Sequence, residues 1–198
     1  MWTLVGLGNP DEEYEGTRHN AGRDFMEHIS RKNSLSDWKK DKLKGALVAK
    51  GELYEEKATF VLPETFMNDS GKSVKHFVGS IKAAEKLIVL QDELDMPLGR
   101  VKISFGSGAG GHKGVASIQK AIKTKEFIRI RIGISPATPS GKLKKPTGDQ
   151  TIDFVLGKFK KTDADKLKKS RTLAEDGIKL ILTEGVGKAM TAINSKQL

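Results

Sequence analysis

Cysteine is absent from this sequence of 198 residues, and its absence excludes several kinds of chemistry together. The chain has no thiol that could act as a nucleophile, no pair that could form a disulfide, and no thiolate ligands for a zinc site of the cysteine type. We therefore expect a cytoplasmic protein whose chemistry depends on oxygen and nitrogen groups.

Long apolar runs are missing as well. No uninterrupted apolar stretch reaches the roughly 18 residues that a membrane-spanning helix needs, so we expect no span. The N-terminus lacks the charged region followed by an apolar region that marks a signal peptide. The length is sufficient to bury a real core, and we expect residues 1–198 to form one domain.

Acidic residues are outnumbered, which gives a formal net charge of +10. Residues 142–171 contain ten Lys or Arg and four Asp or Glu, so much of the excess lies in one segment. A basic surface that serves only solubility is one interpretation. The clustering favours a polyanionic partner such as nucleic acid or a phosphorylated ligand. Aromatic residues are few, which suits a duplex backbone better than stacked single-stranded bases.

The hydrophobic pattern predicts strands that alternate with helices. We expect strands at residues 2–5, 43–51, 56–62, 87–90, 101–105 and 127–134, the second and third forming a hairpin. We expect helices at about 20–32, after 71, after 114, and through most of 160–193, and a mobile basic loop at 136–150. This order predicts a single-domain α/β fold with a mixed, twisted central sheet flanked by helices.

Four predicted turns, at residues 9–20, 65–71, 92–95 and 106–114, hold the unusual polar residues. Three of them follow apolar, strand-like runs, so we expect them to meet at one edge of the sheet. They carry Asn9, His19, Asn68, Asp92 and His112. A histidine, an acid and several amides suit hydrolysis by water: the histidine takes a proton, the acid orients it, and the amides hold the carbonyl.

Other interpretations compete with hydrolysis. Gly6 and Gly8 match the start of a dinucleotide fingerprint, but Pro10 interrupts it and Asp11 occupies its third glycine position, so we reject it. A lone histidine is more often a cap or surface residue, the glycine run at 106–114 could bind phosphate, and two histidines with one aspartate are weak evidence for a metal. The residues alone therefore predict either a hydrolase or a nucleotide-binding domain.

Several motifs, taken together, are more specific. They are Gly6-Leu7-Gly8-Asn9-Pro10, Tyr14, Thr17-Arg18-His19-Asn20-x-Gly22, Pro63-x-Thr65-Phe66-Met67-Asn68-x-Ser70-Gly71, Asp92-Glu93-Leu94-Asp95-x-Pro97-x-Gly99, Gly110-Gly111-His112-x-Gly114, Phe127-x-Arg129-x-Arg131-x-Gly133-Ile134 and Phe154-Val155-Leu156-Gly157. In this order, and over nearly the whole chain, the set resembles the bacterial peptidyl-tRNA hydrolase family.

The resemblance implies an esterase that cleaves peptide from the ribose of peptidyl-tRNA without a metal or other cofactor, as a monomer. It implies that His19 is the general base and that Asp92 orients it, so the two should lie within hydrogen-bond reach. Further roles follow for a larger set: Asn9 and Asn68 on the peptide and the ester carbonyl, Tyr14 and Met67 in shaping the pocket, and Lys102 and Arg131 near the tRNA phosphates. We expect Lys142, Lys144 and Lys145 to border the same groove for the acceptor stem.

Two positions depart from the family pattern. Asp11 replaces a usual glycine, and Lys113 replaces the asparagine that usually follows Gly-Gly-His. An ammonium donates hydrogen bonds to an oxyanion or phosphate but cannot accept them, so Lys113 changes how this part of the substrate site works. An RNA-binding protein that has lost hydrolysis, like the plant organelle splicing factors of this family, is the alternative, and the intact Asn9, His19, Asn68 and Asp92 disfavour it.

Overall fold

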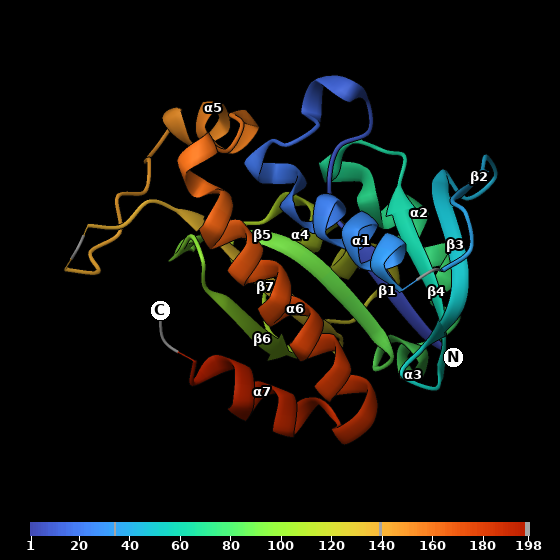
Figure 1. Cartoon of the computed structure of the whole chain (residues 1–198). Coiled ribbons are helices and arrows are strands. Elements are labelled where there is room, and N and C mark those ends of the chain that lie inside the picture. The colour runs from blue at the N-terminus through green and yellow to red at the C-terminus, as the bar shows by residue number, and fades with distance from the viewer. Residues whose placement is uncertain (34, 139, 197–198) are drawn as a thin grey trace.

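The computed structural model describes residues 1–198 except 34, 139 and 197–198. In this part of the chain, seven strands form one sheet in the order β2-β3-β4-β1-β5-β7-β6 (Figure 1). The strands are β1 (Trp2–Gly6), β2 (Lys39–Asp41), β3 (Ala46–Leu53), β4 (Glu56–Pro63), β5 (Leu87–Pro97), β6 (Val101–Phe105) and β7 (Ile128–Ser135). The pairs β1–β4, β1–β5 and β5–β7 are parallel and the other neighbours antiparallel, so the predicted mixed sheet is confirmed.

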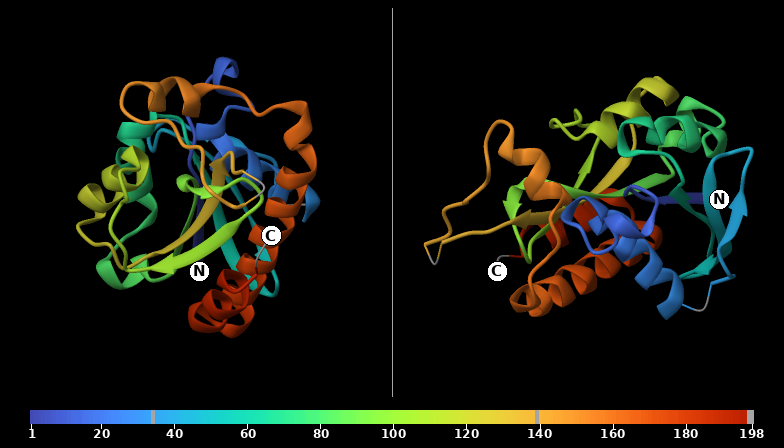
Figure 2. Two further views of the ribbon diagram at one scale, coloured as in Figure 1. Left: turned by 90° about the vertical axis from the view of Figure 1, so that its left-hand side faces the viewer. Right: turned by 90° about the horizontal axis from the view of Figure 1, so that it is seen from above.

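Helices cover both faces of this sheet (Figure 2). One face packs against α1 (Ala21–Lys32), α6 (Ala164–Glu184) and α7 (Val186–Asn194), and the other against α2 (Ser70–Val74) and α4 (Lys113–Ile122). The remaining elements are α3 (Ile81–Ala84), α5 (Gln150–Leu156) and the short 3-10 helices η1 (Glu12–Tyr14), η2 (Arg18–Asn20), η3 (Met67–Asp69), η4 (Lys75–Phe77) and η5 (Lys161–Asp163).

The central strands are apolar on both sides because each of their faces meets a helix layer. Neighbouring residues such as Ile88 and Val89 are both fully buried, yet they belong to the two different cores. Successive side chains of a strand point to opposite faces, so a continuous apolar run fills both cores. None of the described helices is long and apolar enough to cross a membrane.

The structure corrects the sequence prediction in several places. The expected turn at 92–95 is wrong, because β5 continues to Pro97 with a register shift between Glu93 and Pro97, where β7 supplies pairing partners. The edge strand β2 was not predicted, because its three residues are polar. The helix expected after residue 71 is divided into α2, η4 and α3. The described residues of the segment 136–149, all except 139, form no helix or strand, and the mobility of this loop stays a prediction.

The two outer strands are treated differently. The β6 edge lies against α7, and the side-chain amide of Asn194 bonds both backbone groups of Ile103: its Oδ1 accepts the N–H at 2.8 Å and its Nδ2 donates to the C=O at 3.0 Å. The β2 edge is short and carries Lys39 and Lys40. Lysines on a short edge strand are a common way to discourage pairing with another chain.

Helix α1 lies unusually close to the sheet at Gly22. A Cβ atom built there would lie 2.2 Å from the Leu90 carbonyl oxygen and 2.9 Å from that of Leu7, and both contacts are with backbone. The Arg23 N–H also donates to the Leu7 C=O at 2.9 Å. The absence of a side chain at Gly22 therefore lets α1 start directly beneath the turn that carries the polar residues.

This packing predicts that Gly22→Ala lowers the free energy of unfolding by about 1–3 kcal/mol or more, because two backbone segments must separate. Urea unfolding measures the change. Gly187→Ala is the matched control: it lies in helix α7 with nothing within 4 Å of its Cβ position, and it should gain up to about 1 kcal/mol through helix propensity. Equal stability of Gly22→Ala and the wild type would contradict the close approach.

Candidate active site

The polar residues meet where β1 and β4 end and beside the middle of β5, around an open cavity of about 810 Å³. Asn9, His19, Asn68, Asp92 and His112 all line it, so the predicted gathering of these polar residues is confirmed, although Asp92 lies within β5 and not in a turn. The other lining residues are Phe66, Met67, Glu93, Leu94, Asp95, Gly110, Gly111, Lys113, Lys145, Thr151, Ile152, Val155 and Leu156. The cavity is therefore lined by both polar groups and apolar side chains.

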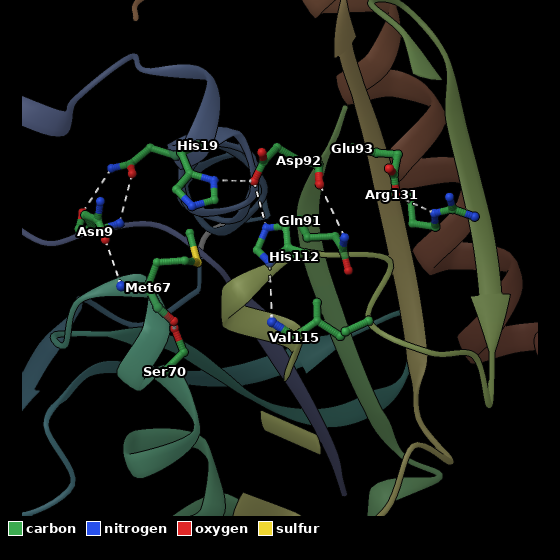
Figure 3. Close-up of polar contacts among 12 residues, drawn as sticks. Asn9, His19, Met67, Ser70, Gln91, Asp92, Glu93, His112, Val115 and Arg131 are labelled. Atoms are coloured by element: carbon green, nitrogen blue, oxygen red, sulfur yellow. Dashed lines mark hydrogen bonds and ion pairs between the residues drawn. The ribbon is translucent and has the colours of Figure 1, made fainter. Parts of the chain in front are cut away.

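One carboxylate oxygen lies at the centre of the polar groups (Figure 3). Asp92 Oδ1 is 2.9 Å from His19 Nδ1 and 2.8 Å from His112 Nε2, so the predicted proximity of His19 and Asp92 is confirmed. The two imidazole rings lie 5.2 Å apart at an angle of 43°. Asp92 is 4% exposed, so these two N–H groups replace the water that an ionised carboxylate would otherwise need.

Backbone contacts determine the proton position on His112. This residue is the N-cap of α4, and its Nδ1 accepts the Val115 N–H at 3.3 Å. Because Nδ1 is an acceptor, the ring proton sits on Nε2 and is donated to Asp92. His112 thus holds Asp92 in place and starts the helix that follows, and it leaves no nitrogen free for the cavity.

His19 is arranged in the opposite way. Its Nδ1 faces the ionised Asp92 and carries a proton, so Nε2 of the neutral ring is the nitrogen without a proton. No hydrogen bond to Nε2 occurs within the described residues. A nitrogen lone pair beside the cavity is the group that removes a proton from water.

The electrostatics around the pair agree with this arrangement. Burial would lower the pKa of His19, but the charge and hydrogen bond of Asp92 raise that pKa above its ordinary value of 6.5, while the Lys113 ammonium opposes the rise. Burial would raise the pKa of the Asp92 carboxyl, but His19 and His112 hold it well below its usual range. Asp92 therefore stays ionised, and His19 is a stronger base than a free imidazole.

Asn9 is held by three hydrogen bonds on the far side of His19. Its backbone N–H donates to Asn20 Oδ1 at 2.9 Å, and Asn20 Nδ2 donates back to the Asn9 C=O at 3.0 Å. Its side-chain Oδ1 accepts the Met67 N–H at 2.8 Å. Since the oxygen of the amide is occupied, its NH₂ group is the part of Asn9 that remains for a ligand.

The other predicted substrate residues are less uniform in their placement. Asn68 and Lys113 line the cavity with exposed side chains, and buried Met67 forms part of its floor. Tyr14 lies in η1 and is not among the described residues that line the cavity. Its predicted role in shaping the pocket has no support from this arrangement.

The predicted basic residues fall into two groups. Lys102 and Arg131 face each other in register across β6 and β7, and Arg131 Nε donates to Glu93 Oε2 at 2.8 Å. Lys145 lines the cavity and pairs with Asp95. Lys142 and Lys144 precede Lys145 in the same loop, are exposed, and are not among the described residues that line the cavity. Glu93 lines the cavity, so it connects the cavity to Arg131.

A divalent cation is the alternative occupant of the centre. His19, Asp92 and His112 offer ligand atoms within 4.8 Å of one another. However, both imidazoles direct their N–H groups at the same carboxylate oxygen, and the Val115 N–H keeps the proton of His112 on the nitrogen that would have to bind the ion. The donor set therefore fits a hydrogen-bonded base and acid better than a metal centre.

Sequence reasoning left several site residues unassigned. His112 was noted among the polar residues but given no role, although a histidine directly before a helix can serve as an N-cap. Asn20 was read only as part of a motif, and its clamp on Asn9 joins residues eleven positions apart. The end of α5 was noted as the motif Phe154-Val155-Leu156-Gly157, but its residues were given no role in lining the cavity.

Comparison with known proteins gives a consistent result. The family model described as peptidyl-tRNA hydrolase matches residues 3–198. A peptidyl-tRNA hydrolase of Dehalococcoides mccartyi is 36% identical over 98% of this chain and 100% of its own length, and one of Thermodesulfovibrio yellowstonii is 38% identical over 98% and 99%. The crystal structure of peptidyl-tRNA hydrolase from Acinetobacter baumannii has a TM-score of 0.86 and 33% identity, covering 100% of this chain and 96% of that one.

The opposing charges around His19 predict two opposite changes of its pKa. Asp92→Asn should lower the pKa, because the negative charge is lost while an acceptor oxygen remains, and Lys113→Asn should raise it, because a positive charge is lost. Titration of the His19 ring signals by NMR measures both. The wild-type value should lie above 6.5. Shifts of the same sign in both variants would contradict the assignment.

Protonated His19 should therefore stabilise the fold below pH 6.5, and this contribution to the free energy of unfolding should vanish as the pH rises through the folded pKa.

Proposed function

The chain belongs to the peptidyl-tRNA hydrolase family, and we propose that it hydrolyses the ester bond between peptide and tRNA with a water molecule that His19 activates. The observation that carries the mechanism is the shared oxygen of Asp92, which orients His19 and leaves Nε2 facing the cavity. The products are a free peptide and a tRNA that can be used again.

In the first step Nε2 of His19 removes a proton from water as the oxygen attacks the ester carbonyl. The resulting imidazolium is stabilised by the Asp92 carboxylate 2.9 Å from Nδ1. His19 then returns the proton to the ribose oxygen as the ester bond breaks, so one residue serves as base and as acid. His112 acts through Asp92, because both of its ring nitrogens are already engaged.

The developing negative charge on the carbonyl oxygen needs donors that are already in position. The NH₂ group of Asn9 is available because its oxygen is bound to Met67, and Asn68 lies on the same rim. Lys113, at the first position of α4, adds a positive charge where an amide is usual in the family. Donors that are fixed before the reaction need no reorganisation during it, which is why they lower the barrier.

The peptide occupies the apolar part of the cavity. Phe66, Ile152 and Leu156 are 56%, 54% and 37% exposed, and all three line it. Such exposed apolar side chains beside a polar centre are typical of a ligand site. Met67 forms the floor, and the tRNA ribose points the ester toward His19.

The tRNA contacts the protein through phosphates. Lys102 and Arg131 bind the phosphates nearest the acceptor end, and Lys142, Lys144 and Lys145 border the acceptor stem. The bond from Arg131 Nε to Glu93 supports this role, because it fixes the guanidinium while leaving its two terminal nitrogens for a phosphate. We place the reaction in the cytoplasm, on a monomer, without a cofactor.

His19→Ala should lower kcat/KM by about 10²–10⁴-fold, the usual contribution of a general base, while tRNA binding is retained. Release of labelled peptide from purified peptidyl-tRNA and a filter-binding assay measure the two properties. His76→Ala is the matched control, since His76 is exposed in η4 away from the cavity. Parallel loss of binding and turnover would assign His19 a structural role, and a wild type that binds tRNA without turnover would favour an RNA-binding function.

Phosphate contacts predict a steep dependence of tRNA affinity on salt. Lys102→Ala should reduce the slope of log affinity against log salt by about one unit, because one counterion fewer is released. Lys188→Ala serves as the control, because Lys188 is exposed in α7 and pairs with Glu184 instead. An affinity that does not change between low and high salt would rule out the electrostatic interface.

A further inference from the structure

Helix α5 follows residues 136–149, of which the described ones form no helix or strand (Figure 1). Its residues Thr151, Ile152, Val155 and Leu156 line the cavity. In the described chain its main packing partner is η2, the short helix that contains His19. The apolar wall that α5 forms is therefore attached to the short helix that carries the general base, and that short helix is in turn attached to β5 of the sheet.

Arg18, the residue before His19, makes this attachment. Its Nη1 donates to the Phe154 C=O at 3.1 Å and to the Gly157 C=O at 3.0 Å, at the C-terminal end of α5. The Phe154 C=O also accepts the N–H of Gly157, the C-cap residue, at 3.2 Å. A positive charge is favoured at that end of a helix. The guanidinium also lies 4.3 Å from the centre of the Phe154 ring and 5.5 Å from that of Phe159.

Backbone contacts hold the same two segments together. The Arg18 N–H donates to the Gly157 C=O at 3.1 Å, and the Phe159 N–H donates to the Gly16 C=O at 3.3 Å. Gly157 leaves room for the guanidinium, since a Cβ atom there would lie 3.0 Å from Arg18 Nη1. The side chain of Arg18 therefore fits a gap that the sequence keeps open.

We propose that Arg18 is a positioning residue that determines specificity for the peptide, because it fixes the distance between the apolar α5 wall and Nε2 of His19. The inference rests on the proposed hydrolysis of peptidyl-tRNA. A large apolar side chain next to the ester carbonyl touches the α5 wall, and its carbonyl then lies where His19 delivers water. A small side chain does not reach the wall and depends on Arg18 much less.

The test compares two substrates that share one tRNA and differ in the acyl group, N-acetyl-leucyl and N-acetyl-glycyl. Arg18→Ala should raise KM for the leucyl substrate by about tenfold and for the glycyl substrate by less than about threefold, the scale of a lost apolar contact. Arg18→Lys should fall between, because an ammonium donates to a carbonyl but cannot reproduce the planar fork or its stacking.

Arg171→Ala is the matched control. The Arg171 guanidinium lies 5.6 Å from the centre of the Phe25 ring, between α6 and α1, so the variant removes the same residue type and a similar contact outside the cavity. The ratio of the two KM values should stay at its wild-type value. A change of that ratio as large as in Arg18→Ala would overturn the proposal.

Leu156→Ala makes the test independent of folding, because it shortens the partly exposed wall itself. It should raise the leucyl KM selectively, and adding it to Arg18→Ala should have little further effect. If the wild type hydrolyses both substrates but Arg18→Ala raises KM equally for both, the role of Arg18 is overturned while the proposed function stands. The same holds if the ratio of the two KM values is unchanged in Arg18→Lys and Leu156→Ala. A wild type that hydrolyses neither substrate would overturn the proposed function, and this inference with it.

Discussion

The site depends on one buried carboxylate oxygen that accepts two imidazole N–H groups. An ionised Asp92 at 4% exposure would be unfavourable without them, so His19 and His112 stabilise the ion as the ion orients the rings. Three parts of the fold meet at this oxygen: η2 through His19, the N-terminus of α4 through His112, and β5 through Asp92 itself. The position of this oxygen therefore also constrains how η2, α4 and β5 pack against one another.

Much of the fold follows from local patterns. The apolar runs of β1 and β5, the alternation in β7 and the amphipathic stretch of α6 were sufficient to predict the class and most elements. The extension of β5 through Asp92 could not be predicted in this way, because its residues are polar. Pairing with Gln91, Asp92 and Glu93 comes from β7, about forty residues later in the chain, and it outweighs local preference.

The features of the site can likewise be divided into those that the sequence predicted and those that only the folded chain reveals. The proximity of His19 and Asp92 was predictable, since polar residues at the ends of neighbouring parallel strands converge. The second histidine, the clamp of Asn20 on Asn9 and the grip of Arg18 on α5 were not. Each depends on where a turn directs a side chain after folding, and each joins segments that no repeat or spacing connects. The position of Lys113, where the family pattern has an amide, illustrates the same limit: its effect on His19 comes from distance and charge.

The contact between Asn194 and Ile103 gives the last helix a task besides packing. A side-chain amide carries the same donor and acceptor as a peptide group, so at this point α7 occupies the place of an eighth strand. A chain shortened before Asn194 would leave the N–H and C=O of Ile103 on this edge without that partner, free to bond a strand of another molecule. Such a truncation would do more than reduce stability: molecules would pair edge to edge through β6, and this association would increase with protein concentration.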